Sequence, residues 1–134
     1  MSRAHRGHMD TDLLRRSLCV ARTAVGIGSW VAPEASGRFF GMGDGMGESG
    51  PALVSRLFGV RDLALAQALR HPSPDVRQAA IRWGAVIDSI DVIATAISVR
   101  RGASGRAAVL VGVGAAVFAA AEVVLLLDDQ PATG

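Results

Sequence analysis

The sequence predicts an all-α protein, a four-transmembrane-helix bundle with charged residues buried between its helices. Three observations predict this fold class: an apolar composition, a long apolar run near the C-terminus, and polar residues that share one face of apolar segments. Half of the 134 residues are hydrophobic before the 16 glycines are counted, and the mean hydropathy is +0.34. In a typical soluble domain, hydrophobic residues and glycine together make up only about 45–50%. The composition therefore favours a membrane.

The chain divides at its polar, proline and glycine clusters. The first twelve residues are polar and predict a flexible arm, with Asp10, Thr11 and Asp12 as N-cap candidates for the first helix. Residues 13–128 predict one membrane domain, and residues 129–134 a short tail. Helices are expected at about 13–32, 52–69, 76–99 and 106–127.

The segment 107–127 is the strongest indication of a membrane. It carries one charged residue, Glu122, and is apolar on every side. About 20 apolar residues cross a hydrocarbon core of ~30 Å. A row of small residues, Gly112, Ala116 and Ala120, predicts close contact with a neighbouring helix.

Cofactor and metal sites are not expected. The loop predicted from Glu34 to Pro51 contains a G-x-G-x-x-G match at 45–50, but no strand precedes it, as a dinucleotide site requires. His5 and His8 form an H-x-x-H pair without further ligands, and Cys19 is the single cysteine. No basic run with interleaved aromatic residues predicts nucleic-acid binding.

Four spans would place both termini on one side of the membrane. Seven arginines fall on that side and four on the other, which favours cytoplasmic termini in a multi-pass protein of the cell membrane. The expected partner is the lipid bilayer, and a second copy of the chain or a partner membrane subunit also fits. The seven are Arg3, Arg6, Arg15, Arg16, Arg70, Arg77 and Arg82, and the four are Arg38, Arg100, Arg101 and Arg106.

Seven charged residues fall inside the expected spans. A charge at the bilayer centre costs at least ~2.5–3.5 kcal/mol. We therefore expect these side chains to form a buried polar network or to reach the bilayer edge. They are Arg22, Arg56, Arg61, Asp62, Asp88, Asp91 and Glu122.

Helical spacing places many of these residues on polar faces. Steps of four and three residues put each set on one side of its helix at 100° per residue. The two stripes are Arg15, Cys19, Arg22, Gly26 and Ser29 in the first helix, and Gly84, Asp88, Asp91, Thr95 and Ser98 in the third.

Depth in the membrane predicts partners within this network. Arg22 and Glu122 lie about equally far from the side of the termini, so we expect them to pair. Arg61 is expected to pair with Asp88 or Asp91. Arg56 is near enough to its helix end to extend to the interface. The four acids outnumber these arginines, so an acid is expected to be protonated or to meet a ligand or water.

Three stretches carry a resemblance to a known family. They are ARTAVG at 21–26, continuing to 32–33 and 38–41, then RLFGVRDLAL at 56–65, and the helix with Asp88 and Asp91. Together they resemble a bacterial family of small four-helix integral membrane proteins of unknown function, over roughly 18–122. The resemblance implies the fold and the membrane setting and no activity. The positions it marks are Arg22, Arg56, Arg61, Asp62, Asp88 and Asp91.

Several functions are compatible with these residues. The first is a non-enzymatic membrane protein that binds a small apolar or lipid-like ligand. The second is a membrane-embedded acid–base enzyme, of isomerase or cyclase type, that uses a buried Asp or Glu. The third is a soluble helical bundle with a polar core. In each case the ion pairs could also serve only to hold the helices together.

Overall fold

The computed structural model describes residues 3–41, 50–103 and 105–128, and the side chains of residues 3–9 and 107 lie outside that description. Of the described residues 91% are helical and none lies in a strand, which confirms the all-α prediction. The elements are α1 Arg3–Val31, α2 Pro33–Phe39, α3 Gly50–Leu69, α4 Pro74–Arg100, and a continuous last helix formed by α5 Gly105–Ala107, the π-helical segment η1 Ala108–Val113 and α6 Gly114–Asp128.

The first helix is longer than the sequence predicted. It begins at Arg3, so that most of the expected flexible arm is helical. The polar residues expected to cap a helix at Leu13 lie inside α1 instead, and two of them bond to side chains of α1 and α6. Asp12 forms an ion pair with Arg15 at 2.8 Å, and the hydroxyl of Thr11 donates to Asp128 at 2.5 Å.

Part of the predicted loop from 34 to 51 is also helical. Pro33 begins the short helix α2, where its fixed backbone angle fits the first turn. Glu34 in the first turn and Arg38 in the last turn complement the helix dipole. Gly41 has a φ of 74°, the left-handed conformation that commonly ends a helix. The glycine-rich motif lies mostly outside the described residues.

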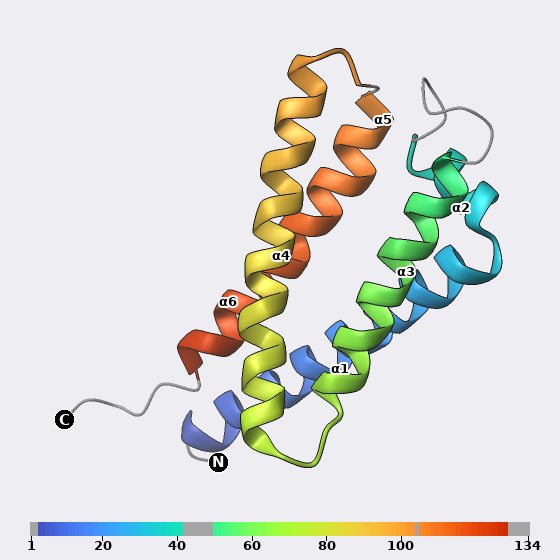
Figure 1. Cartoon of the computed structure of the whole chain (residues 1–134). Coiled ribbons are helices and arrows are strands. Elements are labelled where there is room, and N and C mark those ends of the chain that lie inside the picture. The colour runs from blue at the N-terminus through green and yellow to red at the C-terminus, as the bar shows by residue number, and fades with distance from the viewer. Residues whose placement is uncertain (1–2, 42–49, 104, 129–134) are drawn as a thin grey trace.

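The four long helices form two pairs (Figure 1). α1 packs against α3, and α4 packs against α6, while α2 covers part of α3. The described start of α1 and end of α6 lie at the same end of the molecule, beside the turn between α3 and α4 (Figure 1). The turn between α4 and α5 lies at the opposite end.

The two pairs are joined mainly at the end that carries the termini. A core of small and aliphatic residues from all four long helices fills this end. α1 and α3 approach closely further along, where a Cβ atom at Gly59 would lie 2.8 Å from the carbonyl oxygen of Gly26. The core residues are Leu18, Cys19, Ala66, Leu69, Ala80, Ile81 and Leu125.

The small-residue row of the last helix does not form the expected contact face. Gly112 does contact Thr95 of α4, but Ala116 and Ala120 are exposed. The π-helical segment η1 explains the difference, because its wider turn rotates the residues that follow it relative to a regular α-helix. Ala115 and Glu122 face the bundle instead.

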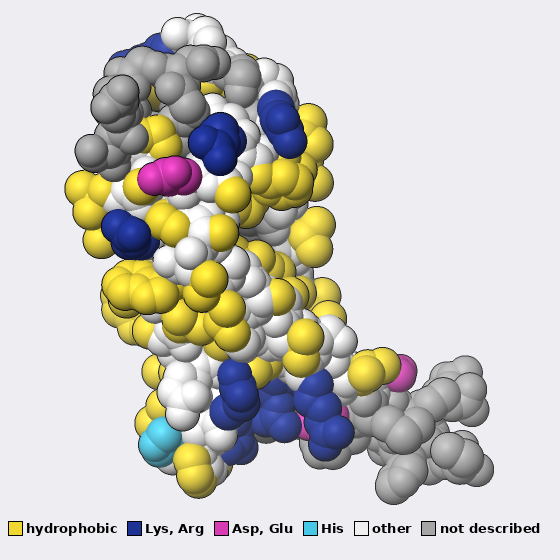
Figure 2. All heavy atoms as spheres, turned by 90° about the vertical axis from the view of Figure 1, so that its right-hand side faces the viewer, with side chains coloured by type: hydrophobic (Ala, Val, Ile, Leu, Met, Phe, Trp, Pro, Cys, Tyr) yellow, Lys and Arg dark blue, Asp and Glu magenta, His cyan; other side chains and the backbone are white. Residues whose placement is uncertain are grey.

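Within the described residues, one helix is long and apolar enough to cross a membrane by length and composition, Ala108–Asp128. The other long helices carry at least three charged residues in every 18-residue stretch. The surface is nevertheless rich in large apolar side chains. Figure 2 shows them over the middle of the molecule, with arginines mainly towards its two ends.

Candidate functional site

The centre of the bundle holds one arginine between three carboxylates. Arg22 on α1 is fully buried and donates hydrogen bonds to Asp62 on α3 at 2.6 Å, to Glu122 on α6 at 2.6 Å, and to Asp88 on α4. Each of the four long helices therefore contributes one charged group. The ring of Phe118 packs 4.7 Å from the guanidinium carbon and completes the enclosure.

A second arginine lies next to this cluster. Arg61 on α3 donates to Asp91 on α4 at 2.5 Å and lies 3.8 Å from Asp62. Its guanidinium packs on the ring of Phe58 at 4.6 Å. The side chains of Arg61 and Asp91 are 26% and 17% exposed, so this pair is more open than the one around Arg22.

The predicted ion pairs can now be compared with the structure. Arg22 does pair with Glu122, and of the two candidates for Arg61 the partner is Asp91. The additional bonds from Arg22 to Asp62 and Asp88 were not expected from depth alone. They form because the long side chain of Arg22 reaches from α1 to both α3 and α4.

One predicted member of the network lies outside it. Arg56 is exposed on α3 and forms no ion pair within the described part of the chain. Its helical position explains this. Arg56 is one residue after Ser55, which is buried on the face that also carries Asp62, so a rotation of about 100° turns Arg56 outwards.

A pocket of about 270 Å³ opens beside the two ion clusters, between the α1–α3 pair and the last helix. Its polar wall is formed by Arg61, Asp62, Asp88 and Asp91 together with two serines, Ser29 and Ser55. The remaining wall is apolar and aromatic. It consists of Val25, Phe40, Phe58, Leu110, Val111, Gly114, Ala115, Val117 and Phe118.

Several buried polar atoms at this site lack a hydrogen-bond partner among the described residues. They are the hydroxyl of Ser55 and the second carboxylate oxygen of Asp88, both on pocket-lining residues, the second oxygen of Glu122, and the Nε–H donors of Arg22 and Arg61. Leaving a buried polar group unpaired costs about 1–3 kcal/mol. A molecule in the pocket that carries a hydrogen-bond donor would offset this cost.

The charges around the pocket do not balance. Two arginines, Arg22 and Arg61, face four carboxylates. If all six groups are ionised, the site has a formal charge of −2. The site therefore suits a proton, a cation or a neutral donor better than an anion.

Three residues next to the charged groups, Ser55, Phe58 and Phe118, were missed by sequence reasoning, although signals for them exist. Ser55 precedes Asp62 by seven residues, two helical turns on the same face. Phe58 precedes Asp62 by four, and Phe118 precedes Glu122 by four, so each ring is placed to cover the neighbouring arginine. Counting back one or two turns from each buried charge would have identified them.

Within the described residues, no three His, Cys, Asp or Glu side chains are placed to hold a metal ion together. Comparison of the chain with protein-family models, curated proteins and solved structures finds no match in any of the three.

Proposed function

We propose that this chain is an integral membrane protein whose four long helices cross the bilayer and whose internal pocket binds a small, mostly apolar molecule through a cationic or hydrogen-bond-donating group. The proposal has two parts, the membrane setting and the ligand. Each rests on different residues and has its own test.

The membrane setting is supported by large apolar side chains on the outside of the bundle and charged side chains inside it, the opposite of a soluble protein. Trp30, Trp83 and Ile93 are half exposed or more, whereas Arg22 and Asp88 are almost completely buried. Exposed apolar surface of this extent is unfavourable in water and favourable in lipid. Charges in turn are tolerated in a membrane protein when they face the bundle interior and pair there.

The last helix supports the same setting. Only 17% of its most apolar 18-residue stretch is buried, whereas the core helix of a soluble protein is mostly buried. The other long helices have 20 or more residues each. About 20 residues suffice to cross the hydrocarbon core. Part of their low hydropathy arises from charges that point inwards, such as Arg22, Asp62 and Asp88, and part from arginines on the exterior.

The ligand chemistry follows from the pocket wall. Its apolar side, from the α1–α3 pair and the last helix, would contact a hydrocarbon portion of the ligand. Its polar side presents the unpaired Ser55 hydroxyl and Asp88 carboxylate oxygen, which is the observation that carries the proposal. The excess of carboxylates favours an amine over an alcohol, and an alcohol over a carboxylate.

An enzyme that uses one of these carboxylates on an apolar substrate is the alternative. The unpaired oxygens of Asp88 and Glu122 are the observation that favours it, since an unpaired carboxylate can accept a proton. All four carboxylates are, however, paired with arginines that also join the helices. Ligand binding needs no reaction of these groups and is therefore the function we propose.

The membrane setting is tested by washing membranes at alkaline pH. The full chain should remain in the membrane pellet, as an integral protein does. Recovery of folded chain in the wash would identify a soluble or peripheral helical bundle and contradict the proposal.

The ligand is tested with three probes of equal chain length: octylamine, octanol and octanoate. Binding to the detergent-solubilised protein, measured by thermal shift and titration, should be strongest for the amine and weakest for octanoate. Ser55→Ala should weaken octylamine binding about ten- to hundredfold, the range of one hydrogen bond to a charged group such as the alkylammonium. The control is Ser98→Ala, on the exposed part of α4, which should have no effect. A preference for octanoate, or equal effects of the two serine substitutions, would contradict the proposed site.

A further inference from the structure

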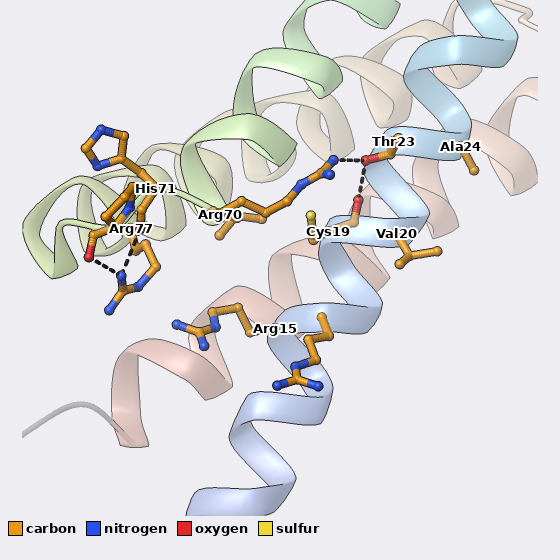
Figure 3. A pocket seen from close by; sticks show the side chains of 11 residues that line it. Arg15, Cys19, Val20, Thr23, Ala24, Arg70, His71 and Arg77 are labelled. Carbon is orange, nitrogen blue, oxygen red and sulfur yellow. Dashed lines mark hydrogen bonds between the residues drawn. The ribbon is translucent and has the colours of Figure 1, made fainter.

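A second site lies at the end of the bundle that carries the termini. A groove of about 960 Å³ runs between α1 and the connection from α3 to α4 (Figure 3). Four arginines line it, and no acidic residue does. They are Arg15 and Arg16 on α1, Arg70 after α3, and Arg77 on α4.

The arginines are positioned by hydrogen bonds that leave most of their donors available. Arg70 donates to the hydroxyl of Thr23 at 2.9 Å, and Arg77 donates to the carbonyl oxygens of His71 and Pro72 at 2.8 and 2.7 Å (Figure 3). Each guanidinium has five N–H groups, so several remain free to bind an anion.

The other two arginines differ in their neighbours. Arg15 is partly neutralised by Asp12, at 2.8 Å. Arg16 is exposed and forms no ion pair with any residue that the structure describes. The groove therefore carries net positive charge. Guanidinium groups suit phosphate in particular, because they bind its oxygens in pairs.

The groove also has an apolar side that continues along α1. Val20 and Ala24 line it, and the exposed residues Ile27 and Val31 extend the same helix face beyond it. The steps of four, three and four residues from Val20 to Val31 keep them on one stripe. This stripe spans about 16 Å at 1.5 Å per residue, close to half of the ~30 Å hydrocarbon core of a bilayer.

We propose that the groove binds the phosphate headgroup of an anionic phospholipid, with one acyl chain lying along the stripe from Val20 to Val31. The inference rests on the membrane setting proposed above. Charge complementarity selects the headgroup, and the length of the stripe matches an acyl chain of one leaflet. Basic pockets between membrane helices bind acidic lipid headgroups by the same physics.

The test compares ligands that share either the headgroup or the chains. Dioleoyl phosphatidylglycerol and dioleoyl phosphatidylcholine have the same chains, while glycerol phosphate and inorganic phosphate have none. Affinities of the full chain in neutral detergent are measured by native mass spectrometry and by thermal shift. Phosphatidylglycerol should bind at least tenfold more tightly than any of the other three.

Two double variants with the same change in charge locate the site. Arg16→Gln with Arg70→Gln should reduce phosphatidylglycerol affinity on the order of thirtyfold, since each arginine near the surface contributes about a fivefold factor. Arg100→Gln with Arg101→Gln, in the turn at the opposite end, should leave it unchanged. Arg16→Gln alone removes no contact of the described fold. This single variant should lower the affinity for phosphatidylglycerol about fivefold, and it keeps the test valid if the double variant does not fold.

Several outcomes would overturn the inference. Equal binding of the two phospholipids would remove the role of the headgroup charge. Equal binding of inorganic phosphate would indicate a site for free phosphate. Equal losses in both double variants would indicate unspecific attraction. A chain that remains in the alkaline-washed membranes but fails these comparisons would overturn only the lipid site, whereas a chain that is washed off would overturn the membrane setting.

Discussion

The backbone of Gly84 on α4 lies directly against the carboxylate of Glu122 on α6. A Cβ atom at position 84 would lie 2.7 Å from the carboxyl carbon of Glu122, closer than real Cβ contacts allow. Because Glu122 is also bonded to Arg22, the missing side chain of Gly84 makes room for the whole central ion cluster.

This relationship predicts that Gly84→Ala is destabilising. The added methyl group must displace the Glu122 carboxylate and lengthen its bond to Arg22, and overpacking of this kind typically costs 1–3 kcal/mol. Gly28→Ala is the matched control on α1, because a Cβ atom there meets nothing within 4 Å. Thermal unfolding of both variants in detergent measures the difference. Equal stability of the two would show that the Glu122 carboxylate moves aside at little cost, and would contradict the importance of Gly84 for the ion cluster.

Arg22 should be the least replaceable residue of the chain. Arg22→Leu leaves Asp62, Asp88 and Glu122 without their shared counter-charge, and removing one partner of a buried pair costs about 3–5 kcal/mol. We expect loss of folded protein, measured as accumulation in membranes and as resistance to proteolysis.

Arg56→Leu is the control for this prediction. It removes the same charge from an exposed position without an ion pair in the described structure, and it should be nearly neutral. Adding Asp88→Asn and Glu122→Gln to Arg22→Leu should recover part of the lost stability, since amides need no counter-charge. Normal accumulation of Arg22→Leu alone would contradict the central role of the cluster.

The polar faces of the helices were predictable because a buried charge must have a partner. In the first predicted stripe, Cys19, Arg22, Gly26 and Ser29 are all buried. The same reasoning predicted the pair Arg22–Glu122 and left Asp88 or Asp91 for Arg61, and in the structure the partner of Arg61 is Asp91. It works because burial cost and helical spacing are properties of the sequence alone.

The meeting of three carboxylates on one arginine was not predictable in this way. It depends on where the helices cross, which is set by close approaches such as that between Gly26 and Gly59. It also depends on the register of the last helix, which η1 changes. Spacing of residues along one helix contains no information on either.

Arg61 should be coupled energetically to Asp91 more strongly than to Asp88. Their 2.5 Å contact predicts a coupling free energy of 0.5–3 kcal/mol in a double-mutant cycle of Arg61→Leu and Asp91→Asn. The cycle of Arg61→Leu with Asp88→Asn should give a smaller coupling, because Asp88 bonds to Arg22 instead. Thermal stability of the single and double variants supplies both values. If Arg61 were coupled to Asp88 and not to Asp91, its pairing with Asp91 would be contradicted.

The arrangement of the helices predicts the topology in the membrane. α4 has 27 residues, about 40 Å of helix, and separates the turn containing Pro72 from the turn containing Ala103. The termini lie at the same end of the bundle as Pro72, where Thr11 bonds to Asp128 (Figure 1). If α4 crosses the bilayer, the two turns face opposite sides.

Single cysteines at the two turns test this topology. Cys19, which is buried, is first replaced by Ala, and Pro72→Cys and Ala103→Cys are then made separately at exposed positions. An impermeant maleimide should label Ala103→Cys in intact cells and Pro72→Cys only in inverted vesicles, as the excess of arginines on the side of the termini predicts. Reporter fusions at Met1 and Gly134 should agree with Pro72→Cys. Labelling of both cysteines from one side would show that α4 does not cross the membrane and would exclude the four-span arrangement.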